Sequence, residues 1–190
     1  MKALVLDGST KKEEIFESVK RDLLDFLRGK KYGIHMRILR EEKIAGCLGC
    51  FDCWLKTPGN CVIKDAGYDL PNEVIHSDVV FLLTPITFGM YSSELKKALD
   101  RFPCPVLLPF FKKVKGEIHH APRYAKYPIL IAVGSLPDVD RNSEETFRML
   151  VSRNAINLHT KAATSIIYSK DQPEEIKEKL LVTLAEVGIR

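Results

Sequence analysis

The chain has 190 residues, of which 45% are hydrophobic and 28% charged, a composition typical of a soluble globular protein with one ordinary core. Its formal net charge is only +4, and we find no apolar run long enough for a membrane span and no nucleic-acid-binding motif, so neither kind of partner is expected. Residues 1–8 are too short and too soon acidic for a signal peptide, so we expect a cytoplasmic protein.

Short apolar runs alternate with segments of helical periodicity along the whole chain. We expect strands at residues 3–6, 34–39, 79–83, 129–133 and 164–168, and helices at about 13–28, 70–76, 93–101, 142–157 and from Pro173 onward. Two segments interrupt this alternation and are treated as insertions: a cysteine-rich loop at 46–64, and a stretch at 103–128 that contains five prolines and is expected to be irregular.

Alternation of this kind predicts an α/β fold, with residues 1–190 forming a single flavodoxin-like domain. Its three layers would enclose a doubly wound, five-stranded parallel sheet in the order 2-1-3-4-5. In such sheets a ligand binds at the carboxyl ends of the strands, at the switch point between the first and third strands. Loops at 8–12, 84–93 and 134–141 would therefore surround one crevice.

Gly8, Ser9 and Thr10 lie between the first predicted strand and the first predicted helix. Backbone N–H groups and hydroxyls at the start of a helix can bind a phosphate, and Lys11 adds a positive charge. Acidic residues in the first helical turn oppose an anion, so the alternative is a plain turn capped by a hydroxyl.

The loop after the third predicted strand has apolar and aromatic side chains shaped by a proline and a glycine. A flat ring can lie against such a wall while backbone N–H groups bind its polar edge. The alternative is an ordinary loop whose aromatic side chains pack on neighbouring elements. Its place at the switch point favours ligand binding by Thr84, Pro85, Ile86, Thr87, Phe88 and Gly89.

Four cysteines, Cys47, Cys50, Cys53 and Cys61, have the spacing C-x2-C-x2-C-x7-C. Three thiols at steps of three and a fourth after a Pro-Gly turn can converge on one centre, as the ligands of a 4Fe–4S cluster do. A zinc site and free thiols, one of them redox-active, are the alternatives. The fifth cysteine, Cys104, lies between two prolines without a nearby partner, and we expect it to act as a small apolar residue.

His119, His120 and Arg123 lie in the stretch expected to be irregular. Adjacent histidines can bind a metal or an anion, and an arginine can bind phosphate. The alternative, which we favour, is a loop packed across a subunit interface.

Together these segments resemble the flavodoxin-like NADPH-dependent FMN reductase superfamily and, within it, the iron–sulfur flavoproteins. The resemblance rests on residues 2–9, on the cysteine loop as far as Asp65, on Ser77 and Asp78, and on residues 84–89 and 94–101. It covers the first half of the chain closely and the remainder in outline.

The resemblance implies an FMN-dependent oxidoreductase that receives electrons from NAD(P)H or a small electron carrier. The FMN phosphate would lie at residues 8–11 and the isoalloxazine ring beside residues 84–89, with Gly134 and Ser135 closing the far side. The four clustered cysteines would ligate a 4Fe–4S cluster that passes electrons to FMN. Members are typically dimers or tetramers, so we expect a homodimer or homotetramer.

The charged residues 11–14 motivate a second hypothesis from a different class. In it the chain is a flavodoxin-fold protein without flavin, acting as a metal- or thiol-based sensor or as an assembly partner.

Overall fold

The computed structural model of the protein describes residues 1–189. Five parallel strands form its central sheet in the order β2-β1-β3-β6-β7, which is 2-1-3-4-5 when only the strands of this sheet are numbered. The predicted fold class and strand order are therefore confirmed. The strands are β1 (Lys2–Asp7), β2 (Gly33–Ile38), β3 (Val79–Pro85), β6 (Ile129–Leu136) and β7 (Ala162–Tyr168).

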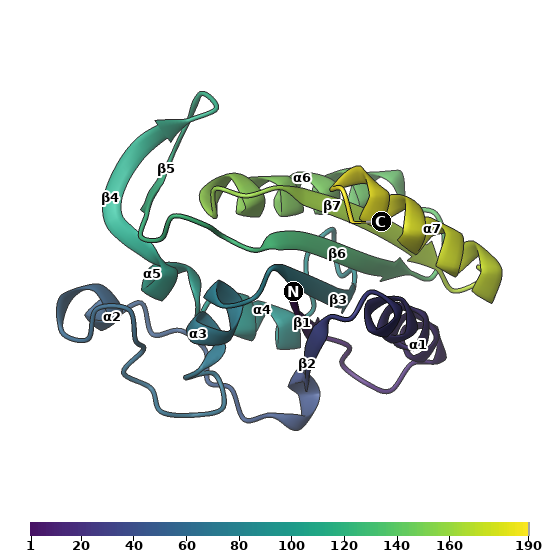
Figure 1. Cartoon of the computed structure of the whole chain (residues 1–190), viewed down its shortest axis with the longest axis horizontal. Coiled ribbons are helices and arrows are strands. Elements are labelled where there is room, and N and C mark those ends of the chain that lie inside the picture. The colour runs from purple at the N-terminus through teal and green to yellow at the C-terminus, as the bar shows by residue number, and fades with distance from the viewer. Residues whose placement is uncertain (190) are drawn as a thin grey trace.

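Helices cover both faces of the sheet and complete the three layers (Figure 1). One face packs against α1 (Glu14–Gly29) and α7 (Pro173–Glu186). The other packs against α3 (Leu70–Ile75), α4 (Ser93–Leu99) and α6 (Arg141–Asn157). Within residues 1–189, every helix is too short or too polar to cross a lipid bilayer.

The alternation of side chains along the central strands explains why they are apolar throughout. In β3, Val80 and Leu82 join the core beneath α4 and α6, whereas Phe81 and Leu83 join the core beneath α1 and α7. Successive residues of a strand point to opposite faces, so a strand covered by helices on both sides needs no polar position. The two cores together fix the register of the sheet.

The segment at 103–128 is not irregular, and that prediction was wrong. It contains a short helix, α5 (Pro103–Val106), and an antiparallel hairpin of β4 (Leu107–Val114) and β5 (Glu117–Pro122), which extends beyond the sheet (Figure 1). Lys115 and Gly116 form its two-residue turn with φ angles of 50° and 87°. Positive φ at both central residues is the requirement of a type I′ turn. The prolines hid the strand pattern because they lie near its ends or on an open edge.

A substitution at Gly134 tests how tightly the sheet packs under α6. A Cβ at this position would lie 2.6 Å from Cδ1 of Ile86 and 2.8 Å from Cε1 of the buried Phe147. We expect Gly134→Ala to lower the free energy of unfolding by about 1–3 kcal/mol, measured by urea denaturation. The matched control is Gly29→Ala at the end of α1, where a Cβ meets nothing within 4 Å. Equal effects of the two substitutions would contradict the packing argument.

Candidate functional site

The carboxyl ends of β1, β3 and β6 meet at one edge of the sheet, as the strand order requires. The loops that leave these strands run from Gly8 to Glu13, from Ile86 to Ser92 and from Pro137 to Asp140. The predicted crevice would lie between these three loops. All residues proposed for cofactor binding lie in these loops or in the strand ends beneath them, but they differ in how they face the crevice.

Ser9 in the first loop faces inward. It is 1% exposed, and both its N–H and its hydroxyl donate to the carboxylate of Asp7, at 3.0 and 2.5 Å. Thr10 and Lys11 are exposed. The outward-facing groups of this loop are therefore Thr10, Lys11 and the backbone, while Ser9 shapes the loop from below.

Asp7 is a buried charge beneath the crevice that sequence reasoning missed. Its side chain is fully buried, and Lys20 of α1 donates to it at 2.7 Å. Burial acts to raise the pKa of Asp7, but hydrogen bonds from Lys20 and Ser9 outweigh it, so the pKa lies below its usual value. The only signal in the sequence was an acidic residue that follows an apolar strand directly.

Arg40 is a second basic residue at the base of the first loop. It lies in the 3-10 turn η1 (Leu39–Glu41) that follows β2, and it donates to the Ser9 hydroxyl at 2.9 Å. Its guanidinium also lies 3.4 Å from Asp7. Lys20 and Arg40 together bring two positive charges to one buried carboxylate.

The second loop ends in a tight turn that displays an aromatic ring. Thr87 and Met90 exchange two backbone hydrogen bonds, of 3.0 and 2.9 Å, around Phe88 and Gly89. These two residues have φ angles of 50° and 73°, and the Phe88 side chain is 93% exposed. Positive φ at both central residues is the requirement of a type I′ turn, which here places the Phe88 ring at its tip.

Two buried hydroxyls join the second loop to the first. Thr84 accepts a hydrogen bond from the N–H of Ser92 at 2.9 Å, and the Ser92 hydroxyl donates to the carbonyl of Gly8 at 2.5 Å. Ser92 also caps the N-terminus of α4 by accepting from Leu95 at 3.2 Å. Thr84 and Ser92 therefore hold the two walls of the crevice in a fixed relation.

Gly134 and Ser135 lie within β6 and are buried. They sit beneath the crevice, and Ser135 offers its carbonyl to the N–H of Ile86 at 2.9 Å. In the loop that follows β6, Asp140 caps α6 by accepting from the N–H and hydroxyl of Ser143 at 3.2 and 2.7 Å.

The cysteine loop leaves β2 at the same edge but then turns away from the crevice. Its cysteines gather around a small cavity beside Arg101, which follows α4, whereas Ser92 at the start of α4 lies in the crevice. The helix between these points rises about 1.5 Å per residue. Figure 1 shows α2 (Asp52–Leu55) and α5 together at the left, away from α1. The two candidate sites therefore lie at opposite ends of α4.

All five cysteines line this cavity, including Cys104. The prediction that Cys104 has no partner was therefore wrong, because α5 brings it to a loop that is distant in sequence. Cys47 and Cys50 are exposed, whereas Cys53, Cys61 and Cys104 are half-buried. Burial and neighbouring thiolates raise the pKa of Cys104 to about 12 and also raise the pKa of Cys53.

Two contacts hold the cysteine loop in place. Arg101 is 2% exposed and donates to both carboxylate oxygens of Asp65 at 3.0 Å, as well as to the carbonyls of Ala45 and Ile63 at 2.9 and 3.0 Å. Trp54 donates from Nε1 to the carbonyl of Leu107 at 2.9 Å. Both contacts tie the loop to the segment that follows α4.

The hairpin histidines have structural contacts. His120 lies with its ring centroid 5.1 Å from that of Trp54 and 4.7 Å from that of Phe111. Nε2 of His119 lies 3.0 Å from the carboxylate of Glu117. The contact of His120 with Trp54 joins the hairpin to α2, and Arg123 donates to the carbonyl of Leu107 at 3.4 Å.

Soft thiolate donors in this number suit an iron–sulfur cluster or zinc. Among residues 1–189, no three His, Cys, Asp or Glu side chains are close enough together to hold a metal ion in the conformation described. The chemistry of the donor set thus fits a metal centre, although the side chains are not arranged as one in this conformation.

A family model described as NADPH-dependent FMN reductase matches residues 1–165 of this chain. The chain belongs to this family. The match includes the crevice loops and the cysteine loop, and it confirms the resemblance drawn from the sequence.

Two iron–sulfur flavoproteins are similar in sequence to this chain. An iron–sulfur flavoprotein of Methanocaldococcus jannaschii is 27% identical over 119 residues, which are 62% of this chain and 61% of that protein. An iron–sulfur flavoprotein of Archaeoglobus fulgidus is 29% identical over 101 residues, which are 53% of this chain and 45% of that protein. The chain thus matches less than two thirds of the length of either relative.

Solved structures agree on the fold. An NAD(P)H:quinone oxidoreductase from Methanothermobacter marburgensis superposes with a TM-score of 0.69 at 8% identity, covering 96% of this chain and 93% of that one. An NADH:FMN oxidoreductase in its apo form superposes with a TM-score of 0.59 at 9% identity, covering 100% of this chain and 91% of that one. At these identities the likeness concerns the fold alone.

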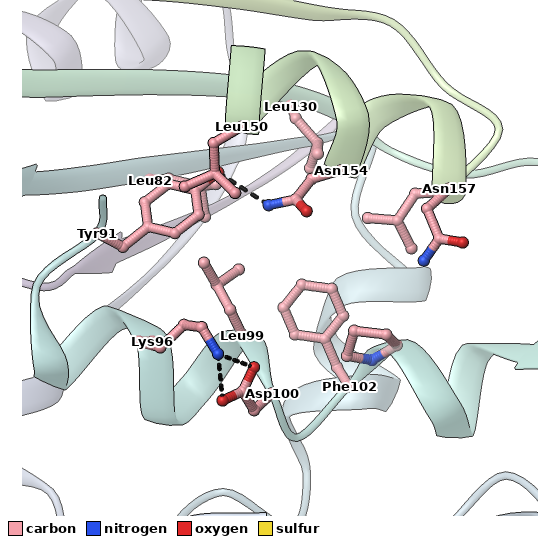
Figure 2. Close-up of a pocket in the computed structure, with 12 residues that line it drawn as sticks. Leu82, Tyr91, Lys96, Leu99, Asp100, Phe102, Leu130, Leu150, Asn154 and Asn157 are labelled. Atoms are coloured by element: carbon pink, nitrogen blue, oxygen red, sulfur yellow. Dashed lines mark hydrogen bonds and ion pairs between the residues drawn. The ribbon is translucent and has the colours of Figure 1, made fainter. Parts of the chain in front are cut away.

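This FMN reductase family member has a further pocket between α4 and α6 (Figure 2). Apolar side chains from both helices and the sheet line it, the hydroxyl of Tyr91 accepts from Asn154 at 3.0 Å, and the Lys96–Asp100 ion pair lies at its rim. Its volume of about 110 Å³ is below the roughly 300 Å³ at which ligand pockets begin. The pocket is thus too small for a flavin and does not replace the crevice as the candidate site.

Proposed function

We propose that this protein is an FMN-dependent oxidoreductase that binds FMN in the crevice and receives electrons from NAD(P)H or a small electron carrier. Membership of the NADPH-dependent FMN reductase family over residues 1–165 carries this proposal. A homodimer or homotetramer is part of it. FMN, when bound, supplies the transfer of a hydride or of single electrons, so no side chain is assigned as an acid or base.

The groups that would bind the FMN phosphate are those of the loop after β1 that face outward. The backbone N–H groups after Ser9, with Thr10 and Lys11, would bind the phosphate at the start of α1. Ser9 and Asp7 would position this loop without touching the phosphate. Gly8 lies close against Leu95, where a Cβ would be 2.4 Å from the Leu95 Cβ, so it lets the loop approach α4.

The turn at Phe88 and Gly89 would border the isoalloxazine ring. Thr84 and Ser92 would keep this turn at a fixed distance from the phosphate loop through their hydrogen bonds to one another and to Gly8. Gly134 and Ser135 would support the ring from beneath through the packing of Ile86. In this arrangement Ile86 and Pro85 serve as the rigid base of the turn.

We propose that Cys47, Cys50, Cys53 and Cys61 ligate a 4Fe–4S cluster that exchanges electrons with FMN. The support is the cavity that all four line and the two iron–sulfur flavoprotein relatives. The backbone N–H of Gly49 already donates to the Cys47 sulfur at 3.5 Å. Hydrogen bonds to the sulfurs are among the interactions that set the potential of such clusters.

The experiment that tests both parts is an anaerobic visible spectrum of the purified protein, with iron and sulfide assayed on the same sample. Flavin bands with a broad iron–sulfur shoulder and about four irons per chain support the full proposal. Flavin bands without iron leave an FMN reductase with free thiols. A colourless protein that takes up no added FMN overturns the proposal.

Replacing Phe88 tests the place of the flavin ring. We expect Phe88→Ala to weaken FMN binding about 10-fold, because one aromatic stacking contact contributes roughly 1–3 kcal/mol. FMN fluorescence quenching during titration measures the affinity. Phe110→Ala in β4 is the matched control, since this side chain is also exposed, at 65%, but lies outside the crevice. Similar affinities for both variants would remove Phe88 from the site.

A second candidate function is a flavin-free metal- or thiol-based sensor or assembly partner. The observation that favours it is the commitment of both Ser9 donors to Asp7, which leaves fewer groups for a phosphate. Metal content without FMN uptake in the experiment above would select this function.

A further inference from the structure

Arg40 is a basic residue beside the loop after β1 that has no role in the proposed FMN site. It lies in η1, and its Nη1 donates to the Ser9 hydroxyl at 2.9 Å and lies 3.4 Å from the Asp7 carboxylate. Strand β2 runs parallel to β1 with Ile38 paired to Asp7, so the ends of the two strands bring these side chains together. Arg40 therefore reaches the loop from a different strand.

The Ser9 hydroxyl is held between two charged groups, which limits what it can offer a phosphate. It accepts from Arg40 and donates to Asp7. The N–H of Ser9 also donates to Asp7, at 3.0 Å. Ser9 therefore has no donor left for an anion, and the guanidinium that is bound to it can supply donors at the same place.

The other basic residues near this loop are less suited to the role. Lys20 is 5% exposed and donates to two carboxylates, both at 2.7 Å. Lys11 and Lys12 are exposed, so holding either of them against a ligand costs side-chain entropy. Arg40 is 17% exposed and already bound to the loop, so it combines access to the crevice side with a fixed position.

The guanidinium of Arg40 also has donors to spare. It carries more N–H groups than its contacts with Ser9, Asp7 and Glu41 use. The contact with Glu41 is 3.4 Å long and Glu41 is 64% exposed, so this surface pair has little energetic value and a stronger acceptor can replace it. A planar guanidinium held at one end by Ser9 can present its other end to a phosphate.

We propose that Arg40 binds the FMN phosphate and makes the crevice discriminate FMN from flavins that lack a phosphate. The inference rests on the proposed FMN site and adds a residue to it. Nη1 keeps its bond to Ser9, while the remaining N–H groups donate to the phosphate together with the backbone of the loop. Glu14 and Glu17 in the first turn of α1 oppose an anion at this helix end, and Arg40 offsets them from outside the helix.

The test compares the affinities of FMN and riboflavin, because these ligands share the isoalloxazine ring and differ by the phosphate. Wild type, Arg40→Met, Arg40→Lys and Lys43→Met, each as the full chain freed of bound flavin, are titrated with both ligands. Quenching of the flavin fluorescence gives the two dissociation constants. Lys43→Met is the matched control, since it removes an exposed positive charge shortly after η1. The urea-unfolding midpoint shows whether each variant is folded.

We expect Arg40→Met to weaken FMN binding about 10- to 100-fold, as the loss of hydrogen bonds to a charged group does, and to leave riboflavin binding within about 3-fold of wild type. Lys43→Met should change neither affinity by more than about 3-fold. Equal losses of both ligands in Arg40→Met would show a merely structural role and overturn the proposal, as would an unchanged FMN affinity. Both results would leave the flavin site itself intact.

Two results in wild type separate this inference from the proposal on which it rests. Equal affinities for FMN and riboflavin would overturn the phosphate contact and keep the flavin site, whereas binding of neither ligand would overturn the proposed function. Should Arg40→Met not fold, Arg40→Lys decides, because an ammonium group lacks the planar fork that binds Ser9 and the phosphate at once. We expect it to weaken FMN binding by about 3-fold or more without affecting riboflavin, and an unchanged FMN affinity would overturn the proposal.

Discussion

Lys20→Met is expected to lower the free energy of unfolding by about 3–5 kcal/mol, because it leaves the Asp7 carboxylate buried without its main partner. Lys20 and Asp7 are 6% and 0% exposed and lie 2.7 Å apart. Arg40 would remain at 3.4 Å and offset part of the loss. Urea denaturation at pH 7 measures the change.

The control for this prediction is Arg28→Met, which removes a basic residue from the same helix. Arg28 is 67% exposed and lies 3.4 Å from Asp25, a surface pair of little energetic value. We expect its effect to stay within about 0.5 kcal/mol. Comparable losses for the two variants would show that the buried pair has no special role.

The pH dependence of the same pair has a defined sign. The pKa of Asp7 is lowered from 3.8, so its contribution is present above that value and is lost as the pH falls through the lower, folded-state pKa. Burial acts to lower the pKa of Lys20, but its hydrogen bonds to Asp7 and Glu17 raise it above 10.5, so its contribution is lost only as the pH rises beyond that value. The stability difference between wild type and Lys20→Met should therefore be constant from about pH 5 to 9 and shrink below about pH 4.

Arg101→Met is expected to have a similarly large effect, about 3–5 kcal/mol, because it removes one partner of a buried ion pair. The Arg101 side chain is 0% exposed, and the carbonyls of Ala45 and Ile63 would lose their donor. Asp65 would keep only the N–H groups of Ala45 and Gly67, at 2.7 and 2.9 Å. Urea denaturation and the rate of proteolysis within residues 45–65 measure the loss.

Arg153→Met is the matched control, since Arg153 is 51% exposed and pairs with Glu117 at 3.0 Å on the surface. We expect this variant to unfold within about 0.5 kcal/mol of wild type and to resist proteolysis as wild type does. Faster cleavage of the cysteine loop in the Arg153 variant would contradict the role given to Arg101.

The amino-acid sequence alone was sufficient to predict the architecture of the sheet, and the crevice at the carboxyl ends of its strands stays a prediction. Apolar runs such as 79–83 and helical faces such as that of Ile176, Leu180 and Leu184 are local patterns, and the structure buries each of them as expected. Once five strands alternate with helices, short right-handed connections leave few strand orders, and the switch point follows.

Contacts between segments distant in sequence were decided only by the tertiary structure. The Asp7–Lys20 pair, the Arg101–Asp65 pair and the place of Cys104 beside the cysteine loop bring together residues that no local sequence pattern predicts to meet. The strands of the hairpin were missed because their open edges tolerate prolines and leave no buried alternation. Sequence periodicity reports which face of an element is buried, whereas the partner of a buried charge or thiol depends on how the packed elements meet.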